Sequence, residues 1–357
     1  MRLILFFYSF YFFFFVWGII LLFVFALFYL FYLTFFDVYT RSFLPPFINK
    51  NPETYINSLL FNDSMKLVIT IPAYNEEQTL GGVLTSIKKV MQKTDYSYQI
   101  LVVDDGSTDK TVAVAKAAGA IVFSHPRNYG LAEAFRTEMK QCLALQADII
   151  LHTDADGQYH ADDIPLLLKK IEEGYDLVLG SRFLGTIESM PLIKRWGNKA
   201  FSRVISNISG MRITDGQTGF RVFTHEVAQI PITSNHTYTQ EQVIRAVQEK
   251  FRVAEVPVYF AERKGSKSRL IRNPFEYASK AWINILRIYR DYKPLKFFGL
   301  FGGFLFLIGF LIGGYAAVLW ILTDRVGGVP RVVLSGVLML VGIQVILFGF
   351  LADMNKR

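Results

Sequence analysis

The sequence predicts an α/β domain attached to a membrane, and three observations lead to this fold class. Between residues 65 and 270, short apolar runs alternate with stretches of helical spacing, a pattern typical of a mostly parallel sheet covered by helices. Polar clusters directly follow the first strands, at the sheet edge where such proteins bind ligands. Long apolar runs occupy both ends of the 357-residue chain.

The elements of the middle region follow from residue period and composition. Continuous apolar runs that include β-branched residues predict buried strands at 66–71, 99–103, 120–123, 148–152 and 177–179. Apolar residues at helical spacing predict helices at 78–91, 110–118 and 131–145. We therefore expect one α/β domain over residues 65–270.

A permanent membrane anchor is predicted at the N-terminus, over residues 1–40. No charged residue occurs between positions 3 and 36, a run of about 50 Å if helical, against a hydrocarbon core of about 30 Å. One tilted transmembrane helix fits this length, whereas two would each be too short. A signal peptide would have a shorter apolar run and a small-residue cleavage site, and this segment shows neither.

A hairpin of two transmembrane helices is predicted at the other end, over residues 296–357. Its spans cover 297–322 and 332–351, and the turn between them contains Arg325 and Arg331. Basic residues gather just before the first of these two spans, at Lys280, Arg287, Arg290, Lys293 and Lys296. Because Lys and Arg concentrate on the cytoplasmic side of membrane proteins, we expect an integral membrane protein whose middle domain is cytoplasmic.

An amphipathic helix is predicted directly before the hairpin, within residues 271–295. Apolar residues recur at helical spacing across 274–292, among them Trp282 and Tyr289, with basic residues between them. This pattern is typical of a helix that lies in the membrane interface. The alternative is a surface helix packed on its own domain, and the span that follows at once favours the interfacial interpretation.

Composition narrows the range of partners. The formal charge of +8 favours anionic ones, such as a lipid membrane or a phosphorylated substrate. No RNP-type or zinc-finger pattern is present in the sequence, so we expect no nucleic acid partner. The single cysteine, Cys142, excludes an intrachain disulfide and a zinc site built from cysteines.

Two polar clusters follow the first two strands. The first, at 72–77, reads PAYNEE, and the second, at 104–109, reads DDGSTD. Neither matches a phosphate-binding glycine loop. Their carboxylates can accept hydrogen bonds from ribose hydroxyls or from a base edge, which indicates a nucleoside ligand. The alternative is that the same side chains cap the helices that follow.

A third cluster, DADGQ at 154–158, follows the strand at 148–152. Asp154 and Asp156 stand one residue apart on a turn, so both carboxylates can reach one divalent cation. Mg²⁺ and Mn²⁺ prefer oxygen ligands, and Mg²⁺ often shares its shell with substrate phosphates. An EF-hand is excluded, because Tyr159 stands where that loop needs glycine. We interpret the nearby His152 as a packing residue and not as a metal ligand.

Six motifs occur in order along the chain: IPAYNEE, VVDDGSTDKT, DADGQ, LGSRF, DGQTGFR and RKGSKSR. With them, residues 66–270 resemble the family-2 inverting glycosyltransferases, whose fold is called GT-A. Within that family the sequence is most similar to dolichyl-phosphate mannose synthases and their glucosyl relatives. The N-terminal anchor departs from the commonest mannose synthase layout and looks more like that of the glucose synthases.

The resemblance implies a role for residues in each motif. Nucleoside binding is implied for Pro72, Tyr74, Glu76, Asp104 and Asp105. Metal binding, with the metal bridging the donor diphosphate, is implied for Asp154, Asp156 and Gln158. Contacts to the donor phosphates are implied for Arg263 and Lys267, and contacts to the lipid phosphate for Arg182 and Arg195. The implied catalytic residues are Asp156, Arg182, Asp215, Gln217 and Glu241, the last three lining the sugar pocket.

The implied reaction transfers a single hexose, with mannose favoured, from a GDP- or UDP-sugar to dolichyl or polyprenyl phosphate. It inverts the anomeric configuration, needs Mg²⁺ or Mn²⁺ and takes place at the cytoplasmic membrane face. The donor leaves as a nucleoside diphosphate, whose charge a metal and cationic side chains must neutralise. The acceptor is a second anion, and arginine suits its phosphate through a planar fork of donors.

Other functions are alternatives. The same kind of enzyme could transfer glucose or an N-acetylhexosamine. A processive polysaccharide synthase is less favoured, because Arg195-Trp196 lacks the glutamine of a Q-x-x-R-W motif and three spans cannot readily build a polymer channel. An inactive nucleotide-sugar-binding membrane protein would be expected to lose Asp156 or the basic segment at Arg263, and both are present. A transporter is disfavoured, because the spans hold no ionisable residue to mark a pathway.

Overall fold

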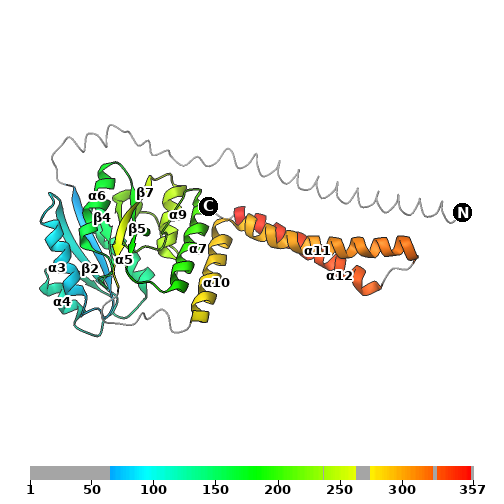
Figure 1. The fold of residues 1–357 in the computed structure, drawn as a ribbon, viewed down its shortest axis with the longest axis horizontal. Helices are drawn as coiled ribbons and strands as arrows, with labels where there is room; N and C mark the ends of the chain where they lie inside the picture. Colours follow the sequence, from blue (N-terminus) through cyan, green and yellow to red (C-terminus); the bar gives the residue numbers. More distant parts are fainter. Residues whose placement is uncertain (1–64, 236, 263–273, 325–327, 355–357) are drawn as a thin grey trace. The chain divides into compact units, whose positions relative to one another are not determined.

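The part of the chain before α10 (Pro274–Tyr292) is built on one seven-stranded sheet with the order β3-β2-β1-β4-β6-β5-β7. Figure 1 shows helices on both sides of this sheet. The computed structural model describes residues 65–235, 237–262, 274–324 and 328–354, so the predicted N-terminal anchor lies outside the described residues. Strand β6 runs antiparallel to β4 and β5, and the other neighbours are parallel. The strands are β1 (Lys66–Ala73), β2 (Ser97–Asp104), β3 (Ile121–Ser124), β4 (Ile149–His152), β5 (Leu177–Ile187), β6 (Arg221–Thr224) and β7 (Val253–Phe260).

The mostly parallel sheet predicted from the sequence is confirmed, and two of its strands were not predicted. Strand β6 has four residues, too few for a clear period, and it lies inside the DGQTGFR motif. Strand β7 contains Glu255 and Pro257 and forms the edge of the sheet beyond β5. Proline is tolerated on an edge strand because one side of that strand needs no hydrogen-bond donors.

Helices cover both faces of the sheet, which explains why its central strands read as continuous apolar runs. Leu67, Ile69 and Ile71 of β1 point to one face, and Val68 points to the other. The first face packs against α3 (Leu80–Met91), α4 (Thr111–Ala117) and α6 (Ile164–Glu172), which follows the short helix η1 (Ala161–Asp163). The second packs against α5 (Leu131–Ala144), α7 (Leu192–Ser209), α8 (His225–Ala228) and α9 (Tyr238–Gln248).

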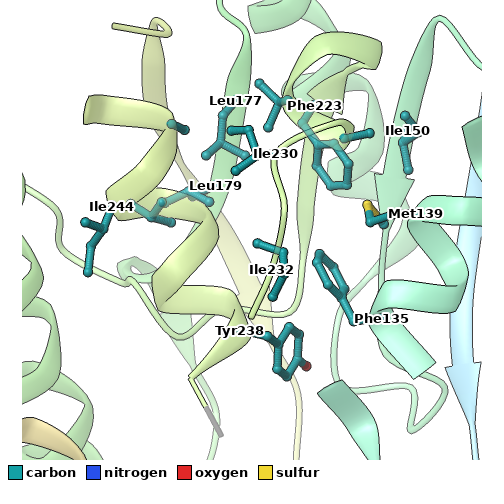
Figure 2. Close-up of a cluster of buried hydrophobic side chains, with 14 of the residues drawn as sticks. Phe135, Met139, Ile150, Leu177, Leu179, Phe223, Ile230, Ile232, Tyr238 and Ile244 are labelled. Atoms are coloured by element: carbon teal, nitrogen blue, oxygen red, sulfur yellow. The ribbon is translucent and has the colours of Figure 1, made fainter. Parts of the chain in front are cut away.

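Figure 2 shows the core on the second face, where Phe135 and Met139 of α5 lie close to Ile150 of β4 and Phe223 of β6. All four side chains are buried. Because this core joins α5 to β4 and β6, it fixes the helix behind the strand that ends in the DADGQ turn. The packed core therefore holds in place the strand from which that turn begins.

The predicted amphipathic helix is present as α10 (Pro274–Tyr292). Ile288 is buried against the core of the second face, whereas Trp282 is 62% exposed. The Asn207 side-chain amide of α7 donates to the Tyr289 hydroxyl over 2.9 Å, and Lys293 Nζ donates to the Asn207 carbonyl over 2.7 Å. The helix thus packs on its own domain through one side and keeps a large apolar side chain exposed on another.

The two C-terminal spans are present as helices α11 (Pro294–Thr323) and α12 (Val329–Met354), which are long and apolar enough to cross a membrane. The helices pack closely at glycines. A Cβ added to Gly302 would lie 2.6 Å from the Gly342 carbonyl oxygen, so only glycine allows this approach. Ser335 Oγ donates to the Gly309 carbonyl over 2.7 Å, which adds a hydrogen bond between the two helices.

Candidate active site

The polar clusters after β1 and β2 form one double turn. Parallel pairing sets Ala73 opposite Asp104, and the Asp105 N–H donates to the Ala73 carbonyl over 2.9 Å. The Asn75 N–H donates to Ser107 Oγ over 2.9 Å, and Asn75 Oδ1 accepts from the Thr108 N–H over 2.8 Å. Asn75 has a φ of 52°, in the left-handed region that asparagine tolerates better than most residues.

The residues predicted to bind the nucleoside lie together on these two strand ends. Pro72 is paired with Val103 one position before Asp104, and Tyr74 and Glu76 follow in the first turn. Asp104 is buried and its Oδ1 accepts from the Ser107 N–H over 3.1 Å. Glu76 Oε2 accepts from the Thr79 hydroxyl over 2.9 Å. Both carboxylates therefore also support their own turns.

Asp105 holds a different loop. Its side chain is buried, its oxygens accept from the N–H groups of Tyr129 and Gly130 over 2.9 and 2.8 Å, and its Oδ1 lies 2.8 Å from His125 Nδ1. The carboxylate thereby fixes the loop after β3 beside the double turn. Its predicted contact with the donor stays a prediction, and its geometry shows a loop-organising role that the sequence motif did not indicate.

The DADGQ turn lies at the end of β4 with both carboxylates half-buried. Asp156 Oδ1 accepts from the Gln158 N–H over 3.1 Å. Gln158 Nε2 donates to the Ala261 carbonyl over 3.1 Å, and the Ala261 N–H donates to the Gln158 carbonyl over 2.8 Å. The turn is thus joined to the end of β7, and a groove of about 560 Å³ opens between it and α3.

The residues of the DADGQ turn fit a divalent cation whose coordination shell also includes atoms of a bound substrate. Within the described ranges, no group of three or more His, Cys, Asp or Glu side chains forms a complete metal site. Asp154 and Asp156 with the Gln158 amide supply oxygen ligands, and Mg²⁺ typically takes one or two carboxylates plus substrate phosphates. The predicted phosphate ligands Arg263 and Lys267 lie outside the described residues, in a segment that begins two positions after Ala261.

The motif DGQTGFR brings a third acidic residue, Asp215, close to this turn. Asp215 is fully buried and pairs with Arg182 of β5, whose Nε and Nη2 lie 2.6 and 2.8 Å from its two carboxylate oxygens. The Arg182 N–H also donates to Asp215 Oδ2 over 3.1 Å. Burial lowers the pKa of Arg182, but Tyr159, Asp215 and Asp154 together outweigh it and raise the pKa, so the guanidinium stays charged.

A buried amide of α7, which the sequence did not single out, connects two of the predicted residues. With its amide oriented so that both atoms are satisfied, Asn198 donates to Gln217 Oε1 over 2.7 Å and accepts from Arg182 Nη2 over 3.3 Å. Arg182, Asp215, Gln217 and Asn198 therefore form one cluster. An isolated asparagine in a helix carries no signal in the sequence, so only the fold reveals it.

Two predicted residues lie apart from this cluster. Glu241 of α9 is buried, and its carboxylate accepts from the N–H groups of Thr233 and Ser234 and from Arg245 Nε over 2.8 Å. It therefore holds the chain that enters α9. Arg195 is exposed in the first turn of α7. Their assigned roles toward sugar and lipid phosphate stay predictions.

A buried polar network lies below the DADGQ turn. His152 Nδ1 lies 2.5 Å from the Gly219 carbonyl oxygen, and its Nε2 lies 3.4 Å from Glu138 Oε2. Burial lowers the pKa of His152 to about 3 and raises the pKa of Glu138 well above its usual value. Burial therefore favours a neutral imidazole and an uncharged carboxyl group in this contact over an ion pair. His152 is fully buried, in accord with its interpretation as a packing residue.

Arg221 lies beside this network, at the start of β6. It is fully buried and opposite His152 in the antiparallel pair of β4 and β6. Its Nη1 donates to the Thr239 carbonyl and to Gln242 Oε1 over 3.1 and 2.9 Å, and its Nη2 donates to the Thr218 carbonyl. Burial lowers its pKa to about 10, which leaves the side chain charged at neutral pH.

Comparisons with known proteins agree with this architecture. Residues 68–229 match the model of glycosyl transferase family 2, and residues 277–356 match that of the glycosyltransferase family 2 C-terminal transmembrane region. The chain is 34% identical to a dolichyl-phosphate hexose transferase of Haloferax volcanii, over 56% of this chain and 84% of that protein. It is 30% identical to a UDP-N-acetylglucosamine–dolichyl-phosphate N-acetylglucosaminyltransferase of Methanococcus voltae, over 54% of this chain and 84% of that protein.

The fold has solved counterparts. A structure of glucosyl-3-phosphoglycerate synthase from Mycobacterium tuberculosis, in complex with Mn²⁺, UDP and glucosyl-3-phosphoglycerate, superposes with a TM-score of 0.50 at 20% identity. The match covers 63% of this chain and 79% of that one. At this level of identity the similarity shows the fold, which is of the GT-A type.

Proposed function

Because the chain belongs to glycosyl transferase family 2, we propose that it transfers a single hexose from a nucleotide-diphosphate sugar to a dolichyl or polyprenyl phosphate. One observation carries this proposal. Carboxylates suited to binding a nucleotide-sugar gather at the ends of β1, β2 and β4, and the Arg182–Asp215 pair lies beside them. Two relatives named for transfer to dolichyl phosphate support the choice of acceptor.

The donor side would use the carboxylates of the first three motifs. Pro72, Tyr74, Glu76 and Asp104 would hold the nucleoside, and Asp154, Asp156 and Gln158 would hold Mg²⁺ or Mn²⁺. When bound, the cation would neutralise charge on the leaving diphosphate. Arg263 and Lys267 would add positive charge to the same phosphates. The link between Gln158 and Ala261 supports this division, because it holds Ala261, two positions before Arg263 in the sequence, beside the turn.

The acceptor side would use Arg182 with Arg195. Asp215 occupies Nε and Nη2 of Arg182, and among the described residues no hydrogen bond involves its Nη1. Arg182 can thus keep its orientation through Asp215 and offer the remaining nitrogen to a phosphate. Arg195 is exposed on the first turn of α7 and would meet the lipid phosphate from the solvent side.

We expect no indispensable general base. A lipid phosphate carries more than one negative charge near pH 7, since a phosphate monoester has a second pKa of about 6. It can attack the anomeric carbon directly, opposite the diphosphate, and invert the configuration. The oxygens of Asp215 and Glu241 already accept hydrogen bonds from protein donors, which supports roles in alignment and not in proton removal.

The donor sugar is the finer part of the proposal. Mannose is favoured, with glucose and an N-acetylhexosamine as alternatives. Purified protein would be incubated with GDP- and UDP-sugars and polyprenyl phosphate, and the lipid product analysed by mass spectrometry. We expect one sugar added per lipid. A polymer would favour a processive synthase, and no product from any donor would favour an inactive nucleotide-sugar-binding protein.

The metal assignment has a direct test. Asp156→Ala should abolish transfer and leave thermal unfolding nearly unchanged, because the side chain lies on a half-buried turn. Asp162→Ala is the matched control, since it removes an exposed carboxylate nearby in η1 and should leave transfer intact. Full activity of the Asp156 variant, or of the wild type in excess chelator, would contradict the assignment.

We also propose that the catalytic domain is cytoplasmic. The basic residues before α11 support this orientation. Cysteine introduced at Thr323, in the last turn of α11, should be labelled from outside intact cells, and cysteine at Thr94 should not. The natural Cys142 is fully buried, so background labelling should be low. The opposite labelling pattern would reverse the orientation.

A further inference from the structure

Gly219 is held from both sides by the segment that carries the proposed metal ligands. Its N–H donates to the Tyr159 hydroxyl over 3.2 Å, and its carbonyl lies 2.5 Å from His152 Nδ1. Because a carbonyl only accepts hydrogen bonds, the proton of the neutral imidazole lies on Nδ1. His152 and Tyr159 flank the DADGQ turn in the sequence, so one segment clamps the Gly219 peptide at both ends.

The Asp154 carboxylate lies directly on Gly219. A Cβ added to Gly219 would stand 2.6 Å from Asp154 Oδ2 and 2.7 Å from Oδ1, closer than real Cβ contacts come. Only glycine leaves room for the carboxylate in this place. The orientation of Asp154 therefore depends on the position of the Gly219 peptide.

The imidazole that holds this peptide is itself fixed from behind. His152 Nε2 faces Glu138 Oε2, which accepts from the Thr70 hydroxyl over 3.1 Å, and Thr70, Glu138 and His152 are all fully buried. The Phe135 ring packs edge-on against the imidazole with 5.3 Å between centroids. The ring of His152 has no solvent to turn into, so its Nδ1 stays directed at Gly219.

We infer that His152 and Gly219 are positioning residues for the metal ligand Asp154. The inference rests on the proposed function, because it requires a divalent cation at Asp154 and Asp156. Neither residue would touch the cation: Gly219 supplies the backbone surface against which Asp154 lies, and His152 holds that surface in place. Groups behind a metal ligand commonly decide whether the ligand points at the metal.

The test measures Mn²⁺ binding to the full-length protein in detergent, from the electron paramagnetic resonance signal of the free ion. In His152→Asn the amide nitrogen takes the place of Nδ1 and keeps the bond to Gly219, whereas His152→Leu loses it. We expect the Leu variant to bind Mn²⁺ about tenfold or more weakly and the Asn variant to stay within about threefold of wild type, in line with the usual 10- to 100-fold effects of outer-shell partners.

Activity gives a second reading of the same variants. His152→Leu should need a higher metal concentration for half-maximal transfer and recover most of its kcat at saturating metal. A side chain that only stabilises the fold would reduce the amount of active protein and leave the metal requirement unchanged. Equal metal requirements in the Leu variant and the wild type would therefore overturn the role of His152, as would equal weakening by Asn and Leu.

Two matched controls separate position from chemistry. His225 Nδ1 lies 2.9 Å from the Ala147 carbonyl oxygen, next to the opposite end of β4, so His225→Leu removes the same kind of bond and should leave Mn²⁺ affinity unchanged. Gly219→Ala should weaken Mn²⁺ binding at least as much as His152→Leu. Gly82→Ala should leave Mn²⁺ affinity unchanged, because an added Cβ at Gly82 meets nothing within 4 Å.

The outcomes distinguish this inference from the proposed metal site. If wild-type protein binds no Mn²⁺, or if Asp156→Asn binds it normally, the metal site itself is wrong and the inference falls with it. If Asp156→Asn loses Mn²⁺ while Gly219→Ala and His152→Leu bind it like wild type, only the inference is overturned. Should His152→Leu fail to fold, Gly219→Ala decides alone, since its added methyl group would meet the half-buried Asp154 carboxylate.

Discussion

The edge of the sheet that carries the candidate site is built in two different ways. At the ends of β1 and β2, half-exposed polar groups exchange hydrogen bonds between adjacent turns, as Asn75 does with Ser107 and Thr108. Near the end of β4, within β5 and at the start of β6, the supporting groups are buried ionisable side chains, some of them charged and some neutral. These are Arg182 with Asp215, Glu138 with His152, and Arg221.

The difference predicts how each part responds to substitution. Water can replace a lost hydrogen-bond partner at the half-exposed turns, so single substitutions there should lower the free energy of unfolding only slightly. A buried group that loses its partner keeps the full cost of desolvation, so single changes at β4, β5 and β6 should cost much more. The part proposed to bind the nucleoside is therefore expected to tolerate variation in its supporting residues, and the part proposed to bind the metal and the sugar is not.

The largest effect is expected for Asp215→Asn. It leaves the buried Arg182 guanidinium without its counter-charge, and breaking one partner of such a pair costs about 3–5 kcal/mol of the free energy of unfolding. Denaturant unfolding in detergent would measure this. The double variant Arg182→Met with Asp215→Leu should recover much of the stability and none of the transfer activity. A cost below about 1 kcal/mol for Asp215→Asn would remove the proposed contrast.

Asp105→Ala tests the contrast from the other side, because Asp105 is a buried carboxylate at the end of the sheet edge that is proposed to bind the nucleoside. The change leaves the Tyr129 and Gly130 N–H groups and His125 without their acceptor. We expect it to lower the free energy of unfolding by about 2–3 kcal/mol. Hydrogen exchange should increase first in the loop after β3. Unchanged exchange there would show that the loop is held by other contacts.

Glu138→Gln should change the pH dependence of stability. Burial raises the folded-state pKa of Glu138, so above its usual pKa the unfolded state releases a proton that the folded state keeps. Wild-type stability is thereby lost as pH rises, by up to about 1.4 kcal/mol per pH unit. Glutamine does not titrate, and His152, Arg221 and Asp154 are the same in both proteins. The melting temperature of the variant relative to wild type should therefore increase from pH 5 to pH 8. A constant difference would mean that Glu138 is ionised in the folded protein.

The smallest effect is expected for Ser107→Ala. It removes the acceptor of the half-exposed Asn75 N–H, which water can replace, and should cost about 0.5–1 kcal/mol. Thermal unfolding beside the Asp215 variant would give the comparison directly. A cost as large as that of Asp215→Asn would show that the two ends of the sheet edge are not built differently.

Much of the fold could be predicted from the sequence because its signals are local. The apolar runs of β1, β2 and β4 exist because both faces of the sheet are covered, and the polar clusters begin where those runs end. The two C-terminal spans follow from length and hydrophobicity alone. The first three polar clusters located the candidate site for the same reason, since each stands directly after a strand.

The sequence by itself thus determined where the strands end and which oxygen-rich turns follow them, since both depend on neighbouring residues. Only the tertiary structure decided which turns meet. Inserting β6 antiparallel between β4 and β5 brings Gly219 under Asp154, although His152 and the Gly219 carbonyl that it contacts are 67 positions apart. The tertiary structure also pairs the Asp105 carboxylate with the loop after β3, and the Glu241 carboxylate with the segment that enters α9. Such partners are chosen by strand pairing and burial across the whole domain, which no local pattern encodes.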